Sequence, residues 1–260
     1  MKKTRKTKQN SLLKIILLLL TYIGLLLVFF PIIKDLVFVE KTTHTTITKI
    51  NQAKEIENIP FDRIDAPTLR EIAESSPQNL ESIGEIQLPS IDLVTPIFSG
   101  LSQQQMIYGA GSMYPKRDPR RNNLVLLGHH VGVSDLLFGK LQQAKVGQKI
   151  YLRYLSDYLE YVITEQKTID ETDLAYLAES SSPKLTLITC DKPTLTKKRI
   201  AVIAQPIKAA GAASVKTKMN KETKQYKQVQ TSLRIKKIVW PIVCLAVLFI
   251  LVTIGILKKV

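Results

Sequence analysis

The fold of this chain is decided by the stretch Leu185-Thr186-Leu187-Ile188-Thr189-Cys190-Asp191. Its β-branched and aliphatic residues lie between a serine and proline cluster upstream and Pro193 downstream, which predicts a short and mostly buried strand. The strand ends in Cys190, one of two cysteines in the chain; the other, Cys244, lies in a long apolar run. Because a thiol at a strand end is held rigidly and can still face a cleft, Cys190 is a candidate nucleophile.

Two more strand ends carry groups that suit acid–base and anion chemistry. An apolar stretch over residues 123–127 runs into Gly128 and then into His129 and His130, two of the three histidines in the chain. Arg199 follows nine residues after the cysteine and opens another apolar stretch. A thiol, an imidazole and a guanidinium at strand ends together suggest a nucleophile, an acid–base group and an anion-stabilising donor.

Each of these residues also has a structural interpretation. A free thiol titrates at about pH 8.5, so Cys190 needs a nearby imidazole or guanidinium to react at neutral pH, and otherwise it is a buried structural cysteine. Arg199 alone fits a surface position on a strand. His129 and His130 do not suggest a metal site, because neighbouring residues of an extended chain point apart and no Cys, His or Asp cluster completes a ligand set.

The segment 85–207 has the pattern of a mainly β domain. Its short apolar stretches, several of them separated by Gly, Pro, Asn or Ser clusters, predict strands at 85–91, 93–98, 123–127, 149–155, 160–167, 184–190 and 198–205. Helical turns are expected at 102–108, 134–141 and 171–178, with Ser102 and Thr172 as candidate caps. Closely spaced strands in about 120 residues predict a closed barrel or a sandwich.

The formal net charge of +15 belongs to the ends of the chain and not to this domain. Residues 1–14 hold six Lys or Arg and no acid, and residues 208–260 hold 11 Lys or Arg against one acid. Residues 34–207 are nearly neutral, with 20 basic and 21 acidic residues. A nucleic-acid-binding domain would carry its charge on the folded part, so no nucleic-acid partner is expected.

Two uncharged apolar runs, at 15–33 and 238–257, are each long enough to cross a bilayer. The first run is longer than the core of a signal peptide, and no small-residue cleavage site comes after it, so we expect an uncleaved anchor. The basic residues before the first run place the N-terminus in the cytoplasm and the domain outside. The basic stretch before the second run does not fit the same rule, but the first span usually sets the orientation.

The expected organisation is a two-pass cell-membrane protein with an extracellular domain. Its parts are a cytoplasmic basic N-terminus (1–14), a transmembrane anchor (15–33), an extracellular stalk (34–84), the β domain (85–207), a basic linker (208–237), a transmembrane helix (238–257) and a cytoplasmic end (258–260). The basic linker either lies against anionic headgroups or anionic wall polymer, or is a solvated spacer.

The motifs of the β domain, taken together and in order, resemble those of the sortases, the cysteine transpeptidases of Gram-positive cell surfaces. Residues 186–191, followed by Arg199, resemble the TLxTC signature and downstream arginine of that family. Residues 127–130 are similar to the end of its catalytic-histidine strand, and residues 136–141 and 147–151 are similar to the segment after that histidine. Similarity to the start of the class A barrel extends over residues 86–91, 96–101 and 108–113.

This resemblance implies a fold and a reaction. The fold would be an eight-stranded sortase-type β-barrel with short helices, flanked by the two transmembrane helices. Cys190 would attack the Thr–Gly bond of an LPxTG-like sorting signal and form a thioacyl intermediate. His129 would protonate the leaving amine and later deprotonate the incoming one, and Arg199 would hold the substrate backbone and the oxyanion. The resemblance assigns Thr189 to the oxyanion and His130 to a substrate contact.

The partners implied by the resemblance are surface proteins that bear an LPxTG-like signal, and an amine of lipid II or peptidoglycan as the acceptor. The chemistry requires no cofactor. Some class A sortases bind calcium through carboxylates beside the cleft. Glu171 and Asp173 lie in the corresponding loop of this chain, but the resemblance assigns no metal ligand among its residues.

The second apolar run is a departure from class A. Class A sortases usually have one N-terminal anchor, whereas pilus-building class C sortases often carry a second C-terminal span. A class C lid contains an Asp-Pro-aromatic triplet, and residues 62–67 are Asp-Arg-Ile-Asp-Ala-Pro, without that triplet. We therefore favour wall anchoring over pilin polymerisation. The same residues also fit a cysteine peptidase, with water in place of the amine, and the two apolar runs also fit a non-enzymatic membrane-tethered scaffold.

Overall fold

The computed structural model describes residues 2–43, 47–52, 56, 59–60, 64–76, 80–132, 136–207, 211–234 and 240–259. The chain forms two compact units. One unit is residues 37–226, which hold the strands, and the other is made of the two helical ends, residues 1–36 and 227–260.

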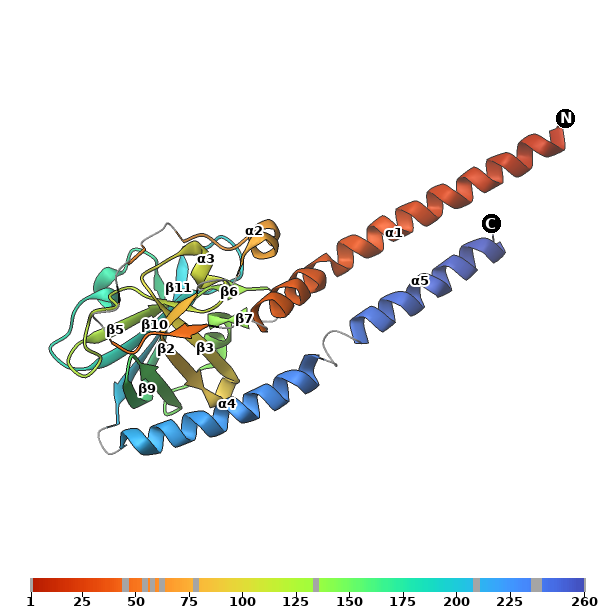
Figure 1. The fold of residues 1–260 in the computed structure, drawn as a ribbon. Helices are drawn as coiled ribbons and strands as arrows, with labels where there is room; N and C mark the ends of the chain where they lie inside the picture. Colours follow the sequence, from red (N-terminus) through yellow and green to blue (C-terminus); the bar gives the residue numbers. More distant parts are fainter. Residues whose placement is uncertain are drawn as a thin grey trace. The chain divides into compact units, whose positions relative to one another are not determined.

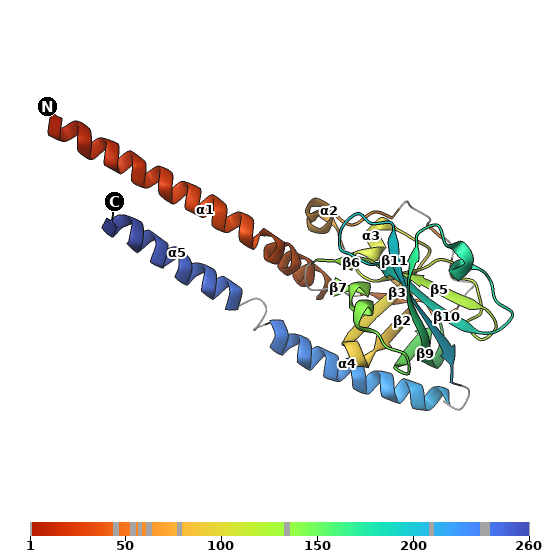
Figure 2. The ribbon, with the colours of Figure 1, turned by 180° about the vertical axis from the view of Figure 1, so that it is seen from behind.

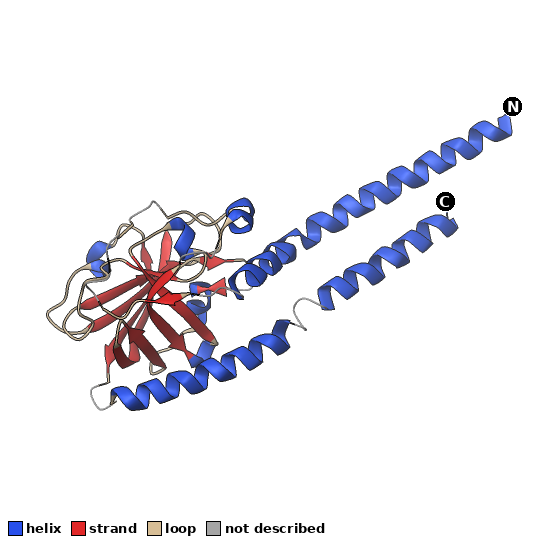
Figure 3. Ribbon diagram, in the orientation of Figure 1, coloured by secondary structure: helices blue, strands red, loops and turns tan. Residues whose placement is uncertain are grey.

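Eight strands close into a barrel (Figures 1 and 3). They are β2 (Glu81–Leu88), β3 (Leu93–Ser99), β4 (Ala110–Ser112), β5 (Asn123–Leu127), β8 (Lys149–Tyr154), β9 (Asp157–Asp170), β10 (Lys184–Cys190) and β11 (Lys198–Pro206). Their order is β2-β3-β4-β5-β10-β11-β9-β8, and the pairing of β2 with β8 closes the ring. The predicted eight-stranded barrel is therefore confirmed, and its strands can be followed from behind in Figure 2.

The side chains of β10, which contains residues 185–190, alternate between the inside and the outside of this barrel. In the antiparallel pairing of β10 with β11, Leu187 lies opposite Val202, and both belong to the buried core inside the ring. Ile188 lies opposite Ala201, which belongs to a smaller buried cluster with Ile169 on the other side of the sheet. Because successive side chains of a strand point to opposite faces, one face of β10 packs in the main core and the other face lies outside the ring.

All seven predicted strands are present, five of them with shifted ends, and one barrel strand was missed. The missed strand is β4, whose sequence Ala-Gly-Ser has neither the length nor the β-branched residues that mark a strand. The predicted helical turn at 102–108 corresponds to α3 (Gln103–Met106). The turn predicted at 171–178 is a 3-10 turn over Leu174–Leu177, and Asp173 caps it in place of Thr172.

The turn predicted at 134–141 starts later than expected, as the 3-10 helix η3 (Phe138–Gln143). The two residues before it form β7 (Leu136–Leu137), which pairs with β6 (His130–Val131). A strand pairing of Leu136 and Leu137 with the histidine segment thus replaces the first turn of the predicted helix, and residues 133–135 lie outside the described part.

The segment predicted as a stalk, 34–84, packs on the barrel in the part that the structure describes. It contains the end of α1 (Lys2–Thr43), the strand β1 (Thr48–Lys49) parallel to β2, and α2 (Leu69–Glu74). Phe38, Ile56, Ile72 and Leu80 are buried. These isolated apolar side chains stand among polar residues, so composition alone made the segment look solvated, whereas each one fills a site on the barrel.

The region predicted as a basic linker, 208–237, is also structured where it is described. It contains α4 (Ala212–Arg234), whose Val215 and Met219 are buried. Lys218 donates to the carboxylate of Glu160 on β9 over 2.8 Å. The spacing of four residues places the two apolar side chains on one helix face. The part of α4 up to residue 226 therefore belongs to the folded unit, although the segment has few apolar residues.

The helical ends contain the two apolar runs. Within α1, Ile15–Lys34 is long and apolar enough to cross a membrane. In α5 (Trp240–Lys259), the apolar stretch Val243–Ile256 is shorter than a full span, and the first two residues of the predicted run, 238–239, lie outside the described part. The structure thus supports the first predicted span more firmly than the second.

Candidate active site

Cys190 and Arg199 are direct partners across two neighbouring strands. Cys190 is the last residue of β10, and it lies opposite Arg199, the second residue of β11. Directly opposite residues of an antiparallel pair point to the same face of the sheet, with Cβ atoms about 5 Å apart. The alternation along β10 places both side chains on the outer face, where Cys190 is half-buried and can be reached from outside the barrel.

His129 reaches the same edge of the barrel from the other side of β10. The strand β5 pairs in parallel with β10, with Leu127 opposite Ile188, and the amide of Gly128 donates to the carbonyl of Ile188 over 3.1 Å. His129 therefore lies two residues beyond the level of Ile188, as Cys190 does on its own strand. The structure brings together the three groups that were selected from separate parts of the sequence.

Two glycines around the histidine pair are required by close packing. A Cβ atom on Gly128 would lie 2.5 Å from Cγ of Phe138, and one on Gly139 would lie 2.5 Å from Cδ2 of His130. Both distances are far below a normal contact between carbon atoms. The short turn η3 thus packs against the histidine segment only because these two positions carry no side chain.

His130 holds the backbone of the candidate nucleophile. Its Nδ1 lies 3.1 Å from the carbonyl oxygen of Cys190, and Nε2 of Gln142 donates to the same oxygen over 3.2 Å. His130 is 5 % exposed, so these contacts favour a supporting role over the predicted contact with substrate. The role of Gln142 was not predicted from the sequence. The one feature that could have suggested it is its position directly after residues 136–141, the segment that follows the histidines.

His129 is buried, and burial controls its protonation. It is 5 % exposed, and its Nε2 has no hydrogen-bond partner among the described residues. Burial lowers the pKa of His129 from 6.5 to about 4, and the charge of Glu71 on α2 raises it by less than burial lowers it. Ile72 of the same helix shares an apolar cluster with Val131, two residues after His129. The N-terminal segment therefore packs beside this histidine.

The thiol of Cys190 is also kept in its neutral form. Burial raises the pKa of Cys190, and the charges of Asp191 and Glu171 act in the same direction. The charge of Arg199 lowers it, but by less than burial raises it. At neutral pH, the resting pair is therefore a thiol and a neutral imidazole.

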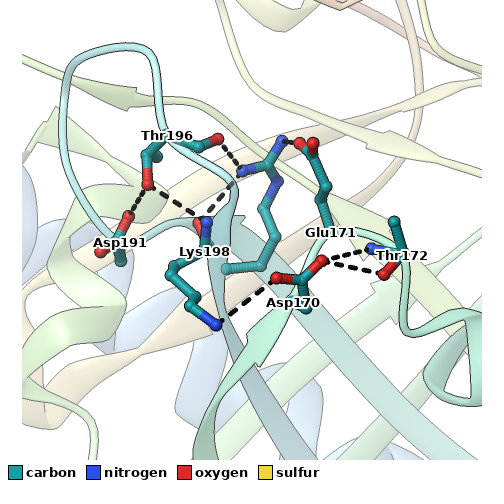
Figure 4. Close-up of polar contacts among 7 residues, drawn as sticks. Asp170, Glu171, Thr172, Asp191, Thr196 and Lys198 are labelled. Atoms are coloured by element: carbon teal, nitrogen blue, oxygen red, sulfur yellow. Dashed lines mark hydrogen bonds and ion pairs between the residues drawn. The ribbon is translucent and has the colours of Figure 1, made fainter.

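Arg199 is held by a network at the ends of β9, β10 and β11 (Figure 4). Its Nη1 donates to the carbonyls of Thr196 (2.7 Å) and Lys198 (3.0 Å), and its Nη2 donates to Glu171 (2.9 Å). The hydroxyl of Thr196 donates to Asp191 over 2.7 Å, which closes the loop between β10 and β11. This network fixes the guanidinium at the strand end that carries Cys190.

Thr189 lies on the opposite face of β10 from the thiol. It pairs with Ile200, which belongs to the core inside the barrel, and it is 2 % exposed. Its hydroxyl has no hydrogen-bond partner among the described residues. Because successive residues of a strand point to opposite faces, this position does not favour the predicted contact of the Thr189 hydroxyl with an oxyanion.

The carboxylates considered for calcium have protein partners. Glu171 binds Arg199, and Asp173 accepts from the amide of Ala175 at the start of a 3-10 turn. Among the residues that the structure describes, no group of three or more His, Cys, Asp or Glu side chains is placed to hold a metal ion.

Comparison with known proteins identifies the family. The sortase domain family matches residues 86–207. The chain is 32% identical to sortase A of Listeria monocytogenes over 200 residues, which are 74% of this chain and 90% of that protein. It is 30% identical to sortase A of Streptococcus agalactiae over 231 residues, which are 83% of this chain and 93% of that protein.

A solved structure of the Listeria monocytogenes protein is also similar. It has 38% sequence identity and a TM-score of 0.47, over 49% of this chain and 88% of that one. The identity to the two sortase A sequences extends over nine tenths of their length, well beyond the barrel motifs. This chain therefore belongs to the sortases, the cysteine transpeptidases that anchor surface proteins.

Proposed function

We propose that this sortase cleaves an LPxTG-like sorting signal between Thr and Gly and joins the surface protein to the amine of a cell-wall precursor. One observation carries the assignment of residues. Cys190 lies opposite Arg199 at the ends of β10 and β11, and His129 comes after the strand that pairs with the other side of β10. A nucleophile, a proton carrier and a fixed cation thus share one edge of the barrel.

The first half of the reaction uses the neutral resting pair. His129 accepts the proton of the Cys190 thiol as the sulfur attacks the carbonyl carbon of the threonine. The tetrahedral intermediate collapses, the C–N bond to glycine breaks, and the protonated imidazole gives its proton to the leaving amine. The product is a thioester between Cys190 and the threonine, and the thioester divides one amide exchange into two easier steps.

The second half of the reaction reverses these proton transfers. The acceptor amine attacks the thioester carbonyl, and His129 takes a proton from the amine. The C–S bond then breaks, and His129 returns the proton to the sulfur, which restores the thiol of Cys190. In both halves, the negative charge that develops on the carbonyl oxygen needs fixed donors, and Arg199 supplies them. A positioned donor of this kind typically changes a rate by about 100-fold or more.

The relatives favour a wall-precursor amine as the acceptor. Sortase A enzymes of two organisms match this chain over nine tenths of their length. The second apolar helix, α5, is the observation that favours a pilin lysine as the alternative acceptor, because class C sortases often carry such a helix.

We further propose that the protein spans the membrane twice, with the barrel outside. The stretch Ile15–Lys34 and the basic residues before it support the first span and its orientation. Residues 240–259 form the helix that would provide the second span. Labelling of introduced cysteines near each end of the chain, in intact and in permeabilised cells, tests this topology.

A ligation assay tests the reaction. The full chain in detergent is incubated with a fluorescent LPxTG peptide and either triglycine, a lipid II-like amine or a pilin domain with a free lysine. We expect a ligated product and an acyl adduct on the protein by mass spectrometry, both lost in Cys190→Ala. Hydrolysis without ligation to any amine would indicate a peptidase. Ligation to the pilin lysine alone would indicate the class C function.

A further inference from the structure

We propose that Glu171 is a positioning residue for the transpeptidation reaction and acts by holding the guanidinium of Arg199 beside Cys190. This inference rests on the proposed role of Arg199 as the oxyanion donor. It gives Glu171 a function in the reaction that does not involve a metal ion.

The contacts of Arg199 define which of its donors a substrate can use. A guanidinium is planar and carries five N–H donors. Both donors of Nη1 reach backbone carbonyls, those of Thr196 and Lys198, and one donor of Nη2 reaches Glu171 (Figure 4). Three anchors in one plane fix the orientation of the group. Among the contacts within the described part of the chain, the Nε donor and the second Nη2 donor are left for a substrate oxygen in a fixed direction.

The sheet explains why Glu171 is placed for this contact. In the pairing of β9 with β11, Ile169 lies opposite Arg199, so the two side chains share a face. Glu171 lies two residues after Ile169, and the period of two brings it to the same face. Its backbone is tied to the same strand end, because the amide of Glu171 donates to the carbonyl of Lys197 over 2.8 Å.

Arg199 is the more buried member of the pair, and Glu171 is the more exposed one. The side chain of Arg199 is 25 % exposed and that of Glu171 is 39 % exposed. Partly buried charges are screened by salt much less than exposed ones. The two backbone carbonyls that accept from Nη1 also limit the alternative orientations of the guanidinium, so Glu171 selects one of few arrangements.

Glu171 has a second effect on the nucleophile, through its charge. The cation of Arg199 favours the thiolate of Cys190, and the carboxylate of Glu171 opposes it, as the directions of their effects on the pKa of Cys190 indicate. Orientation and charge can be separated by substitution. Glu171→Gln keeps an oxygen that accepts from Nη2 and removes the charge, whereas Glu171→Ala removes both.

The test measures both effects in the full chain in detergent, with an LPxTG peptide and triglycine. Glu171→Ala should lower kcat by between about 10-fold and 100-fold with a smaller change in KM, as expected when a catalytic donor is misplaced. Glu171→Gln should keep most of kcat and should shift the pH curve of iodoacetamide alkylation at Cys190 to lower pH. Equal losses of kcat in the two variants, with an unshifted alkylation curve in Glu171→Gln, would overturn the inference.

A double-mutant cycle separates positioning from a general effect on structure. Because Glu171 acts through Arg199, adding Glu171→Ala to Arg199→Ala should cost no further activity. The matched control is Asp170→Asn, which removes the neighbouring negative charge and its ion pair with Lys198 at 3.4 Å, and keeps an oxygen that can accept from Thr172. We expect the control to retain kcat within about two-fold. Full additivity in the cycle, or an equal loss in the control, would refute the positioning role.

The same variants distinguish a failure of this inference from a failure of the proposed function. If Cys190→Ala or Arg199→Ala kept normal activity, the proposed function would be wrong. If both lost activity and Glu171→Ala kept it, the proposed function would stand and only the inference on Glu171 would fail. A thermal unfolding curve for each variant shows whether a loss of activity comes from unfolding.

Discussion

Protonation of His129 should make the folded protein less stable as the pH falls from 7 towards 4. The folded-state pKa of about 4 lies below the ordinary value of 6.5, because the imidazole is buried. Between these two values the unfolded chain binds a proton that the folded chain does not, so stability rises with pH in this window. The stability is fully present above pH 6.5 and is lost as the pH falls through the folded-state value.

The size of the effect is set by the two pKa values. One pKa unit corresponds to 1.36 kcal/mol. The difference between 6.5 and about 4 therefore costs about 2 kcal/mol of unfolding free energy at pH 5 and about 3 kcal/mol at pH 4. For a domain of this size, a loss of about 2 kcal/mol lowers the melting temperature by roughly 4–8 °C.

Calorimetry of the full chain in detergent, at about pH 7.5 and pH 5, measures this loss, with His129→Gln as the comparison. The glutamine does not titrate, so the variant should lose less stability than the wild type over the same range. Partners also lower the pKa of carboxylates such as those of Glu160 and Asp170, but these groups are the same in both proteins, so their effect cancels in the comparison. An identical loss in the two proteins would show that His129 is not buried in its neutral form.

Three further substitutions test packing: two lie beside the site and one lies on α4. Gly128→Ala should destabilise the fold by about 1–3 kcal/mol in thermal unfolding, because the new Cβ would lie 2.5 Å from Cγ of Phe138, and an unchanged melting temperature would contradict this close packing. Lys218→Met leaves Glu160 with one lysine partner in place of two. We expect the free energy of unfolding to fall by about 1 kcal/mol and proteolysis within α4 to become faster. Unchanged proteolysis would contradict the docking of that helix. Ile72→Ala should lower the free energy of unfolding by about 2–5 kcal/mol. Because this change loosens α2, it should also weaken the dependence of stability on pH that His129 causes. An unchanged dependence on pH would mean that α2 does not shield the imidazole.

The sequence predicted the parts of the fold whose pattern is local. The strand β5 has a run of apolar residues, and β10 alternates β-branched and aliphatic residues; both were predicted with their observed ends. The strand β4 has no such pattern, because its place depends on β3 and β5 on either side. The docking of α2 and α4 was missed for the same reason. Each of these helices buries only one or two apolar residues, which are visible as core residues only once the barrel is present.

The residues of the site also differ in whether they can be recognised from the local sequence. Cys190, His129 and Arg199 were selected because each has a distinctive chemistry at a predicted strand end. Glu171 and Gln142 have common side chains, and their partners are 28 and 48 residues away in the sequence. Their roles depend on the register of β9 with β11 and on the packing of η3, which the sequence pattern does not specify.

The position of the thiol on the outer face of the barrel explains why such supporting residues are needed. A side chain inside the ring is fixed by close packing on all sides, as Leu187 is. Cys190 lies on the other face, where its geometry depends on hydrogen bonds to its backbone from His130 and Gln142 and on the cation opposite it. The barrel core therefore sets the positions of the strands, and polar residues outside the core set the positions of the reacting groups. Substitutions of these polar residues should change the rate of ligation more than the stability of the fold, whereas substitutions of the core should do the reverse.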